Sequence, residues 1–572
     1  MTGNELALLA RTAVHLQPAQ VAHRARLRAQ RRALRRWPEA GRRLLNGPDP
    51  RTAVGWPTAF RPLDSRTPHH WPGLNDVRDG NLGLLGTTRN LGDPIDWQHA
   101  DAPQLWRFHL HYWDWTWGLA ADPDRAAART LFAKLWRSWW STVIFGRGDA
   151  WLPYPAALRA WSWCGLYREM AVGTELEDRF VQELAAHAGY LRWHLESDLG
   201  GNHLIKDLKA LIGLAIFFAD DGMLRHAVRR LTAQLAVQIL PDGGHFERAP
   251  AYHCQVIGDL IDVADLLNSA GRAPEAEVTA AITAMRRWLG EVLLPDGEVP
   301  LLNDGYPVAH ELIAALEPGK APSGPLLALP DTGLVRAAVG GWHLLADVGA
   351  PCSDELPGHA HADTLGCLVH VDGAPLLVDT GTSTYAPGSV RAYERSTAAH
   401  NTVEVDSSDS TEVWGAFRAA RRARVHGLKT CADAEVVSIE AAHDGFRRLP
   451  GSPSHRRHWS LTASRLLVND QVTGGGRHAV VARWHLTPGA AVRLKQGGAA
   501  VTTADGDFAV SVAASCPLKL TVETEQIAVG FIRKAVAPVL TCRIDAALPV
   551  RITTCWRRAG DWQVMSEEEE SA

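Results

Sequence analysis

The 572-residue sequence predicts an α+β multidomain protein with a helical first half and an antiparallel β-sandwich as its second half. Three observations predict this order. Apolar residues recur at helical spacing from about Leu105 to Leu316, and short runs rich in Val, Leu and Thr replace them later. A Pro- and Gly-rich stretch at 317–325 separates the two patterns. The length also exceeds what one ordinary hydrophobic core supports.

The first half contains several amphipathic segments of similar length. One runs through Leu204, Leu208 and Leu211, and polar or glycine-rich breaks at 198–202 and 241–244 separate such segments. Many helices joined by short loops indicate an α-helical bundle or toroid. Asn202 lies at the start of one helix, where its side chain can serve as the N-cap or can equally contact a substrate carboxylate.

The second half is punctuated by turns. Leu365–Val371 and Pro375–Val378 flank Asp372-Gly373, which predicts a β-hairpin. The predicted organisation is listed here by residue range: a basic helical or extended region at 1–100, the helical domain at 101–325, the β-sandwich at 326–562 and a disordered acidic tail at 563–572, which includes Glu567–Glu570.

The charge distribution restricts the class of partner. The formal net charge of −4 gives no overall electrostatic reason to bind nucleic acid. Nine arginines between Arg24 and Arg43 are the exception: this run can hold an anionic polymer or a membrane surface, or can form a solvated helix.

The cysteine content and the expected absence of targeting segments bear on the cellular compartment of the protein. The eight cysteines contain no Cys-x-x-Cys pair, so free thiols in a reducing compartment are expected. We expect no signal peptide and no transmembrane span, and hence a cytoplasmic location, although a periplasmic or envelope-associated one stays open. The oligomeric state does not follow from the sequence.

Tryptophans concentrate in the first half, with ten of them between Trp106 and Trp163, Trp113 included. Indole rings pack on the apolar faces of sugars while their N–H groups stay available as donors. The alternative is a large helical core. We expect most of these tryptophans to fill the core and two or three to contact a ligand.

Residues able to carry chemistry occur in both halves. His359, His361 and Asp363 alternate, so an extended chain places them on one face, and Asp379 and His400 follow. Two histidines and a carboxylate can bind a zinc-like ion, or can form ordinary hydrogen bonds. In the first half, the 241–253 loop carries Glu247 and Tyr252, which are either functional or only satisfy the backbone of the loop. Asp304 lies in a turn, at 303–306, that is a further candidate.

Taken in order along the chain, the motifs resemble those of the heparinase II/III-like polysaccharide lyases over most of its length. The stretches that carry the resemblance are 105–112 (LWRFHLHY), 151–155 (WLPYP) with Arg159, 202–205 (NHLI), 242–253, 359–363 (HAHAD), 378–381 (VDTG) and 395–402 (RSTAAHNT). The family implies an incomplete (α/α) toroid followed by antiparallel sheets. It also implies β-elimination on an acidic, uronate-containing polysaccharide, in a role linked to surface polysaccharide.

The resemblance also implies roles for individual residues. Asn202 would neutralise the substrate carboxylate, Tyr252 would act as base and acid, and His359 would be the second proton-transfer group. The expected substrate-binding residues are Arg159, His203, Glu247, Trp113 and Tyr154. One structural zinc ion, as in some members, would be bound by His361, Asp379 and His400, and no organic cofactor is expected.

The chemistry gives these roles a reason. Charge that develops on the enolate must be stabilised more than the ground state, and a tyrosine can serve as base if nearby positive charge lowers its pKa. Two alternatives remain. Glu247 and Asp304 could serve as acid and base of a glycoside hydrolase, or the chain could bind polysaccharide without cleaving it.

Overall fold

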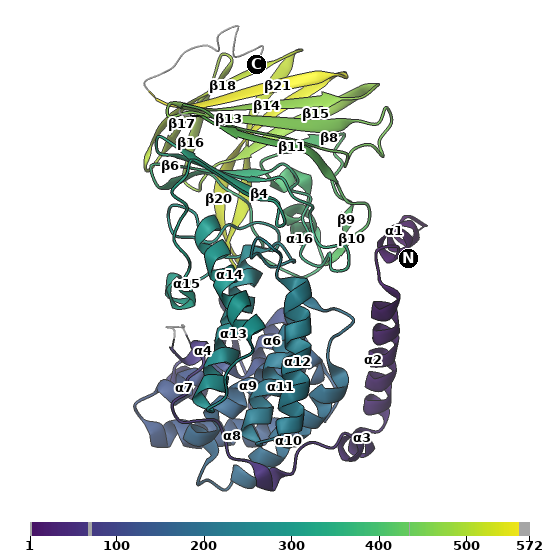
Figure 1. Ribbon diagram of the computed structural model, residues 1–572, viewed down its shortest axis with the longest axis vertical. Coiled ribbons are helices and arrows are strands. Elements are labelled where there is room, and N and C mark those ends of the chain that lie inside the picture. The colour runs from purple at the N-terminus through teal and green to yellow at the C-terminus, as the bar shows by residue number, and fades with distance from the viewer. Residues whose placement is uncertain (1–2, 67–70, 434, 560–572) are drawn as a thin grey trace.

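The computed structural model describes residues 3–66, 71–433 and 435–559, so the expected acidic tail lies outside the described residues. Figure 1 shows two stacked halves, with the helices at one end and the sheets at the other. The first strand of the sheet half begins at Leu326, directly after the Pro- and Gly-rich segment. All eight cysteines carry free thiols. Among the described residues, no helix combines the length and the apolar character that a membrane span requires.

The helical half is arranged around α11 (Gly201–Phe217), which packs against four other helices and is buried along nearly all of its length. Proline begins both α9 and α13, a position where its missing N–H costs no hydrogen bond. The helices of this half are α6 (Gln104–Tyr112), α7 (Trp117–Ala121), α8 (Arg125–Thr142), α9 (Pro153–Leu166), α10 (Glu177–His194), α11, α12 (Asp221–Gln238), α13 (Pro250–Ser269), α14 (Ala276–Val292) and α15 (His310–Leu316).

Tryptophans fill the centre of this half, as expected for most of them. The fully buried ones in the Trp-rich stretch are Trp106, Trp113, Trp115, Trp136, Trp139 and Trp163. Some of their rings meet edge to face, for example Trp139 and Trp163 with centroids 5.2 Å apart. Edge-to-face contacts add to the free energy gained by burying so much apolar area.

An N-terminal arm, residues 3–45, runs along one side of the molecule (Figure 1). It consists of α1 (Gly3–Ala13), α2 (Pro18–Arg36) and α3 (Pro38–Leu44). Leu27 and Leu34 are the buried residues of α2. The chain then reaches the helical half through α4 (Leu63–Arg66), α5 (Leu74–Arg78) and a hairpin of β1 (Asn81–Leu84) and β2 (Thr87–Asn90).

Three antiparallel sheets form the second half, in the strand orders β3-β4-β5-β6-β7, β11-β12-β13-β14-β21-β18-β17-β16 and β19-β20-β15-β8, with a separate β9-β10 pair. Their facing sides bury one hydrophobic core. The strands are β3 (Leu326–Leu329), β4 (Leu334–Val339), β5 (Trp342–Asp347), β6 (Cys367–Val371), β7 (Ala374–Leu377), β8 (Val403–Val405), β9 (Val413–Trp414), β10 (Arg418–Ala419), β11 (Val425–Ala432), β12 (Val437–His443), β13 (Ser454–Leu461), β14 (Arg465–Thr473), β15 (Arg477–His485), β16 (Ala491–Lys495), β17 (Gly498–Thr503), β18 (Gly506–Ala514), β19 (Leu518–Gly530), β20 (Arg533–Ala547) and β21 (Val550–Arg558).

The predicted hairpin is confirmed as β6 and β7. Val371 pairs with Ala374, and the two residues between them, Asp372 and Gly373, have φ values of 52° and 93°. Positive φ at both central positions is the conformation that a two-residue type I′ turn requires, which is why Asp-Gly is favoured there.

Candidate functional site

The candidate site forms where loops and helix ends of the helical half meet loops of the sheet half. Its first element is the start of α11. The backbone N–H of Asn202 donates to Glu247 Oε1 at 2.8 Å, and its Nδ2 lies 3.1 and 2.9 Å from the two carboxylate oxygens of Glu247. A carboxylate is favoured there because the first turn of a helix presents unpaired N–H groups and a partial positive charge.

Gly201 makes this contact possible. It has φ +54°, and a Cβ at this position would lie 1.9 Å from Glu247 Oε1. Any larger residue would displace the Glu247 carboxylate. Gly200 and not Asn202 is the N-cap of α11, so the capping alternative for Asn202 is wrong: its amide bonds a carboxylate 45 residues later instead.

His359 links Glu247 to a second buried carboxylate. Its Nε2 lies 3.3 Å from Glu247 Oε2, and its Nδ1 lies 2.9 Å from Asp304 Oδ2. Burial alone would lower the pKa of His359, but hydrogen bonds to Asp304 and Glu247 raise it to about 9. Burial would likewise raise the pKa of Glu247, yet the bond to His359 lowers it to about 2. The imidazole is therefore protonated and the Glu247 carboxylate ionised at neutral pH.

Asp304 is the most heavily bonded side chain of the site. Arg391 of α16 (Ser389–Glu394) binds both of its oxygens, with Nη2 2.8 Å from Oδ2. His361 Nε2 lies 2.9 Å from Oδ1, and the Thr382 hydroxyl donates to the same oxygen at 3.3 Å. Despite complete burial, Arg391 and the histidines hold the pKa of Asp304 well below its usual range. A planar two-point contact of this kind fixes both groups in orientation.

Tyr252, near the start of α13, packs against His359 with ring centroids 3.9 Å apart and planes tilted by 32°. Its hydroxyl lies 2.7 Å from that of Tyr385, over whose ring the Arg391 guanidinium lies at 5.1 Å. Burial, with contributions from Tyr385 and Tyr306, raises the pKa of Tyr252 well above 10. A tyrosine serves as base if neighbouring positive charge lowers its pKa, and that condition is not met in this arrangement, because burial and the neighbouring Tyr385, Tyr306 and Asp304 raise the pKa of Tyr252.

His203 and Tyr154 form the half-buried edge of the site. Their rings contact each other with centroids 4.4 Å apart and planes tilted by 43°, and His203 Nδ1 lies 3.0 Å from Glu196 Oε2. Both side chains remain partly accessible to solvent, as binding of a ligand requires. The ammonium of neighbouring Lys206 bonds buried Asp259 at 2.7 Å.

Two of the expected substrate-binding residues lie in the core instead. Arg159 is fully buried, and its guanidinium bonds His187 Nε2 and the carbonyl oxygens of His111 and Ala150. Trp139, Trp151 and Trp163 surround the same guanidinium. Trp113 is fully buried as well, stacked between Trp97 and Trp115. Neither residue can reach a polysaccharide, so both assignments are corrected to structural roles in the core.

The 358–366 segment is a loop, so the extended strand expected for it is wrong. His359 and His361 nevertheless face the same target, since each bonds one oxygen of Asp304. Asp363 departs from that face, and both of its buried carboxylate oxygens lack a hydrogen-bond partner. The loop is held by hydrogen bonds, for example from the His361 N–H to Asn303 Oδ1 at 2.9 Å.

The three residues expected to bind zinc lie near one another. His400 Nδ1 lies 2.8 Å from Asp379 Oδ2, and the rings of His361 and His400 have centroids 5.3 Å apart. Buried His361 Nδ1 and His400 Nε2 have no hydrogen-bond partner. Imidazole and carboxylate are suitable zinc donors. Across the described residues, however, no three His, Cys, Asp or Glu side chains are arranged to hold a metal ion, so zinc binding stays a prediction.

Two residues of the site were missed by sequence reasoning. Tyr385 and Arg391 lie in and beside a loop after β7 and reach Tyr252 and Asp304, which are 133 and 87 residues away in the chain. No spacing or periodicity connects residues so far apart. The only available signal was the concentration of polar residues just after the Asp379-Thr380-Gly381 strand end.

Comparison with known proteins covers both halves. The model described as Heparinase II/III N-terminus matches residues 86–317, and the model described as Heparinase II/III-like, C-terminal, matches residues 321–537. FtsZ-localized protein C of Caulobacter vibrioides is 26% identical over 484 residues, 79% of this chain and 81% of that protein. A heparin-sulfate lyase of Bacteroides stercoris is 22% identical over 252 residues, 38% of this chain and 37% of that protein.

A solved structure extends the likeness in fold. The crystal structure of heparinase III has a TM-score of 0.71 and 15% sequence identity, covering 83% of this chain and 82% of that one. Its arrangement of helices followed by antiparallel sheets is therefore shared. The two family matches, which together span both halves of the chain, show that the chain belongs to the heparinase II/III-like family.

Proposed function

We propose that the protein is a lyase that cleaves a uronate-containing acidic polysaccharide by β-elimination. The observation that carries this proposal is the position of the Tyr252 phenol. It packs against His359 at the junction of the two halves, and both nitrogens of that imidazole face buried carboxylates. The heparin-sulfate lyase of Bacteroides stercoris, a relative over about two fifths of the chain, supports the same reaction class.

In this reaction a base removes the proton α to the uronate carboxylate, a C=C bond forms, and the glycosidic C–O bond breaks. Burial holds the pKa of Tyr252 well above 10 in the unliganded protein, so the step requires that this phenol lose its proton when substrate binds. The phenolate would then accept the α-proton and, as phenol, donate it to the departing oxygen, so protons balance without a water molecule. Tyr385 bonds this hydroxyl and would hold it in position. Asn202 and His359 would stabilise the negative charge that develops on the substrate carboxylate.

Hydrolysis by Glu247 and Asp304 is disfavoured by their bonding. A glycoside hydrolase needs one carboxylic acid that carries a proton at the working pH. The pKa of Glu247 is lowered to about 2, and both Asp304 oxygens are occupied by Arg391. Neither group can serve as a general acid near neutrality.

The direct test is incubation with a panel of uronate polymers while the ultraviolet absorbance of the unsaturated uronate product is followed. Only elimination creates that chromophore. New reducing ends without it would overturn the proposal in favour of hydrolysis. Absence of product with every polymer, together with measurable binding, would overturn it in favour of the second candidate.

The second candidate is a polysaccharide-binding protein that keeps the fold without the reaction. One observation favours it: the Nδ2 of Asn202 and the hydroxyl of Tyr252 are both already engaged within the protein. The relative from Caulobacter vibrioides is also named for localisation with FtsZ and not for lyase activity. In this case a pull-down with purified FtsZ, compared with an unrelated filament protein, is the next measurement.

A further inference from the structure

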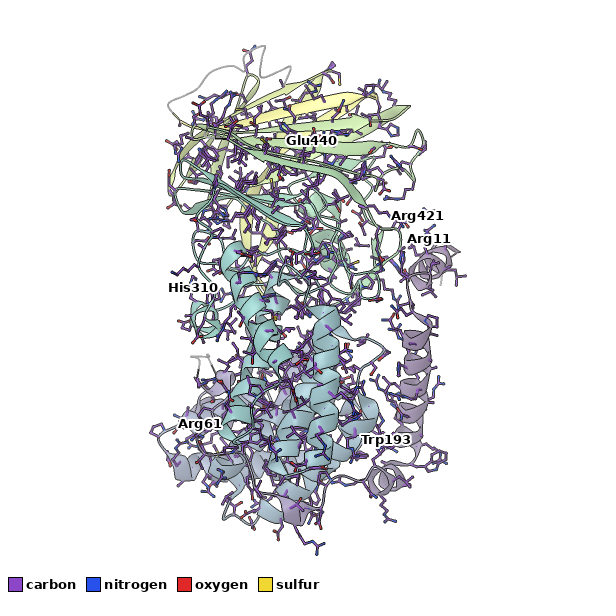
Figure 2. All side chains as sticks on the ribbon, viewed as in Figure 1. Arg11, Arg61, Trp193, His310, Arg421 and Glu440 are labelled. Carbon is purple, nitrogen blue, oxygen red and sulfur yellow. The ribbon has the colours of Figure 1, made fainter. Side chains whose placement is uncertain are left out.

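The N-terminal arm contacts both halves through one side only. At its upper end, Arg11 of α1 and Arg421 of the sheet half lie together and bond the same carboxylate, Glu412, at 3.3 and 3.5 Å (Figure 2). Further along, Arg24 bonds Asp198 at 3.3 Å and Arg31 approaches Glu196 at 3.8 Å. These contacts fix which face of α2 points inward.

The solvent-exposed surface of the arm is strongly basic. The exposed arginines are Arg26, Arg28, Arg32, Arg35, Arg36 and Arg43. None of them forms an ion pair with a carboxylate in the part of the chain that the structure describes. No acidic residue occurs anywhere in α2, although the whole chain carries a net charge of −4. The positive charge of these six arginines is therefore not offset by ion pairs among the described residues.

Large apolar side chains are exposed on the same arm: Leu6 (55%), Leu9 (40%), Val14 (80%), Val21 (53%), Trp37 (60%) and Leu44 (79%). Single exposed apolar residues are common. A series of them among unpaired arginines is typical of a surface that binds a protein partner or a membrane. Arginine is suited to such a boundary, because its stem packs on apolar groups while the guanidinium bonds phosphate.

We propose that the outer face of the N-terminal arm docks on an anionic lipid bilayer. The guanidinium groups would bind lipid phosphates, and Val14, Trp37 and Leu44 would enter the boundary between headgroups and acyl chains. An acidic polysaccharide would match the arginines equally, but it offers no apolar phase for these three side chains. The bilayer is therefore the partner that accounts for both observations. This inference is independent of the proposed lyase activity.

The test is co-sedimentation of the full chain with vesicles. The protein should bind vesicles of phosphatidylglycerol and phosphatidylcholine about tenfold or more tightly than vesicles of phosphatidylcholine alone, and added salt should weaken binding. The triple variant R28E/R32E/R35E should lose about tenfold or more in affinity. A matched control, R447E/R493E/R533E, makes the same change in charge at exposed arginines of the sheet half and should bind as the unmodified protein does.

The V14S/W37S/L44S variant separates a bilayer from a soluble polyanion. It keeps every arginine, so it should lose vesicle binding severalfold while binding of a soluble acidic polysaccharide stays unchanged. Equal binding to both vesicle types, or equal losses in the arm and control triple variants, would overturn the proposal. So would vesicle binding that is unaffected by the apolar substitutions. Circular dichroism and thermal melting confirm that each variant is folded.

Discussion

Substitution of Gly201 by alanine tests whether the Glu247 carboxylate organises the site. The new Cβ would lie 1.9 Å from Glu247 Oε1 and 2.5 Å from a side-chain carbon of Leu356, so the carboxylate must move by more than 1 Å. The φ of +54° adds about 1–2 kcal/mol of strain for a residue with a Cβ. A displaced Glu247 also loses its contacts with Asn202 and His359, at about 1.5–3 kcal/mol for a hydrogen bond to a charged group.

We therefore expect Gly201→Ala to lower the free energy of unfolding by about 3–5 kcal/mol, measured by urea denaturation. Gly271→Ala is the matched control, because Gly271 has φ +70° and nothing within 4 Å of an added Cβ. It should cost only the backbone strain. In the elimination assay Gly201→Ala should be slower by about 100-fold, since a misplacement of about 1 Å has that effect on catalysis. Equal stability losses in the two variants would refute the reasoning.

Three further predictions concern the reaction, pH and metal. Tyr252→Phe should reduce elimination by about 10²–10⁴-fold with an unchanged melting temperature, whereas Tyr306→Phe, which removes a hydroxyl nearby, should retain most activity; a fully active Tyr252→Phe would exclude the assigned role. Buried Asp470 has its pKa lowered to about 2, against the effect of burial, by Arg457 and His455. Its ionised form therefore stabilises the fold by about 2.5 kcal/mol above about pH 4, and this contribution is lost as pH falls through about 2. In urea unfolding, the stability difference between the unmodified protein and Asp470→Asn should shrink over that range, and a difference that does not change with pH would contradict it. If the unpartnered nitrogens of His361 and His400 bind zinc, elemental analysis should find about one zinc per chain in the unmodified protein and none in His400→Ala; a metal-free unmodified protein would remove the metal site.

The fold was largely predictable because its signals are local. The Asp372-Gly373 turn identified a hairpin, since a two-residue turn fixes the register of its strands. Helical periodicity likewise identified the first half. The segment from His359 to Asp363 shows the limit: alternation predicted a strand, but bonds to Asn303 and Asp304 hold it as a loop.

The family motifs identified residues of the site and residues of the core alike, so a motif alone did not separate the two. Arg159 occurs in a family motif, yet three tryptophans and three hydrogen-bond acceptors bury it. Neither burial nor partner follows from local sequence, because both arise from contacts between distant segments. The same reason explains why Tyr385 and Arg391 were missed.

The contact between the two halves restricts which amino-acid changes either half can accept. The site is built from both sides of the 317–325 segment. The helical half supplies Asn202, Glu247, Tyr252 and Asp304, and the sheet half supplies His359, Tyr385 and Arg391. The bonds between these two groups of residues therefore act like those of a subunit interface, although they lie within one chain. Neither half can be exchanged for a distant counterpart without losing complementary charges at that interface. The two halves must therefore change together, and the isolated helical half would expose buried carboxylates without their cations.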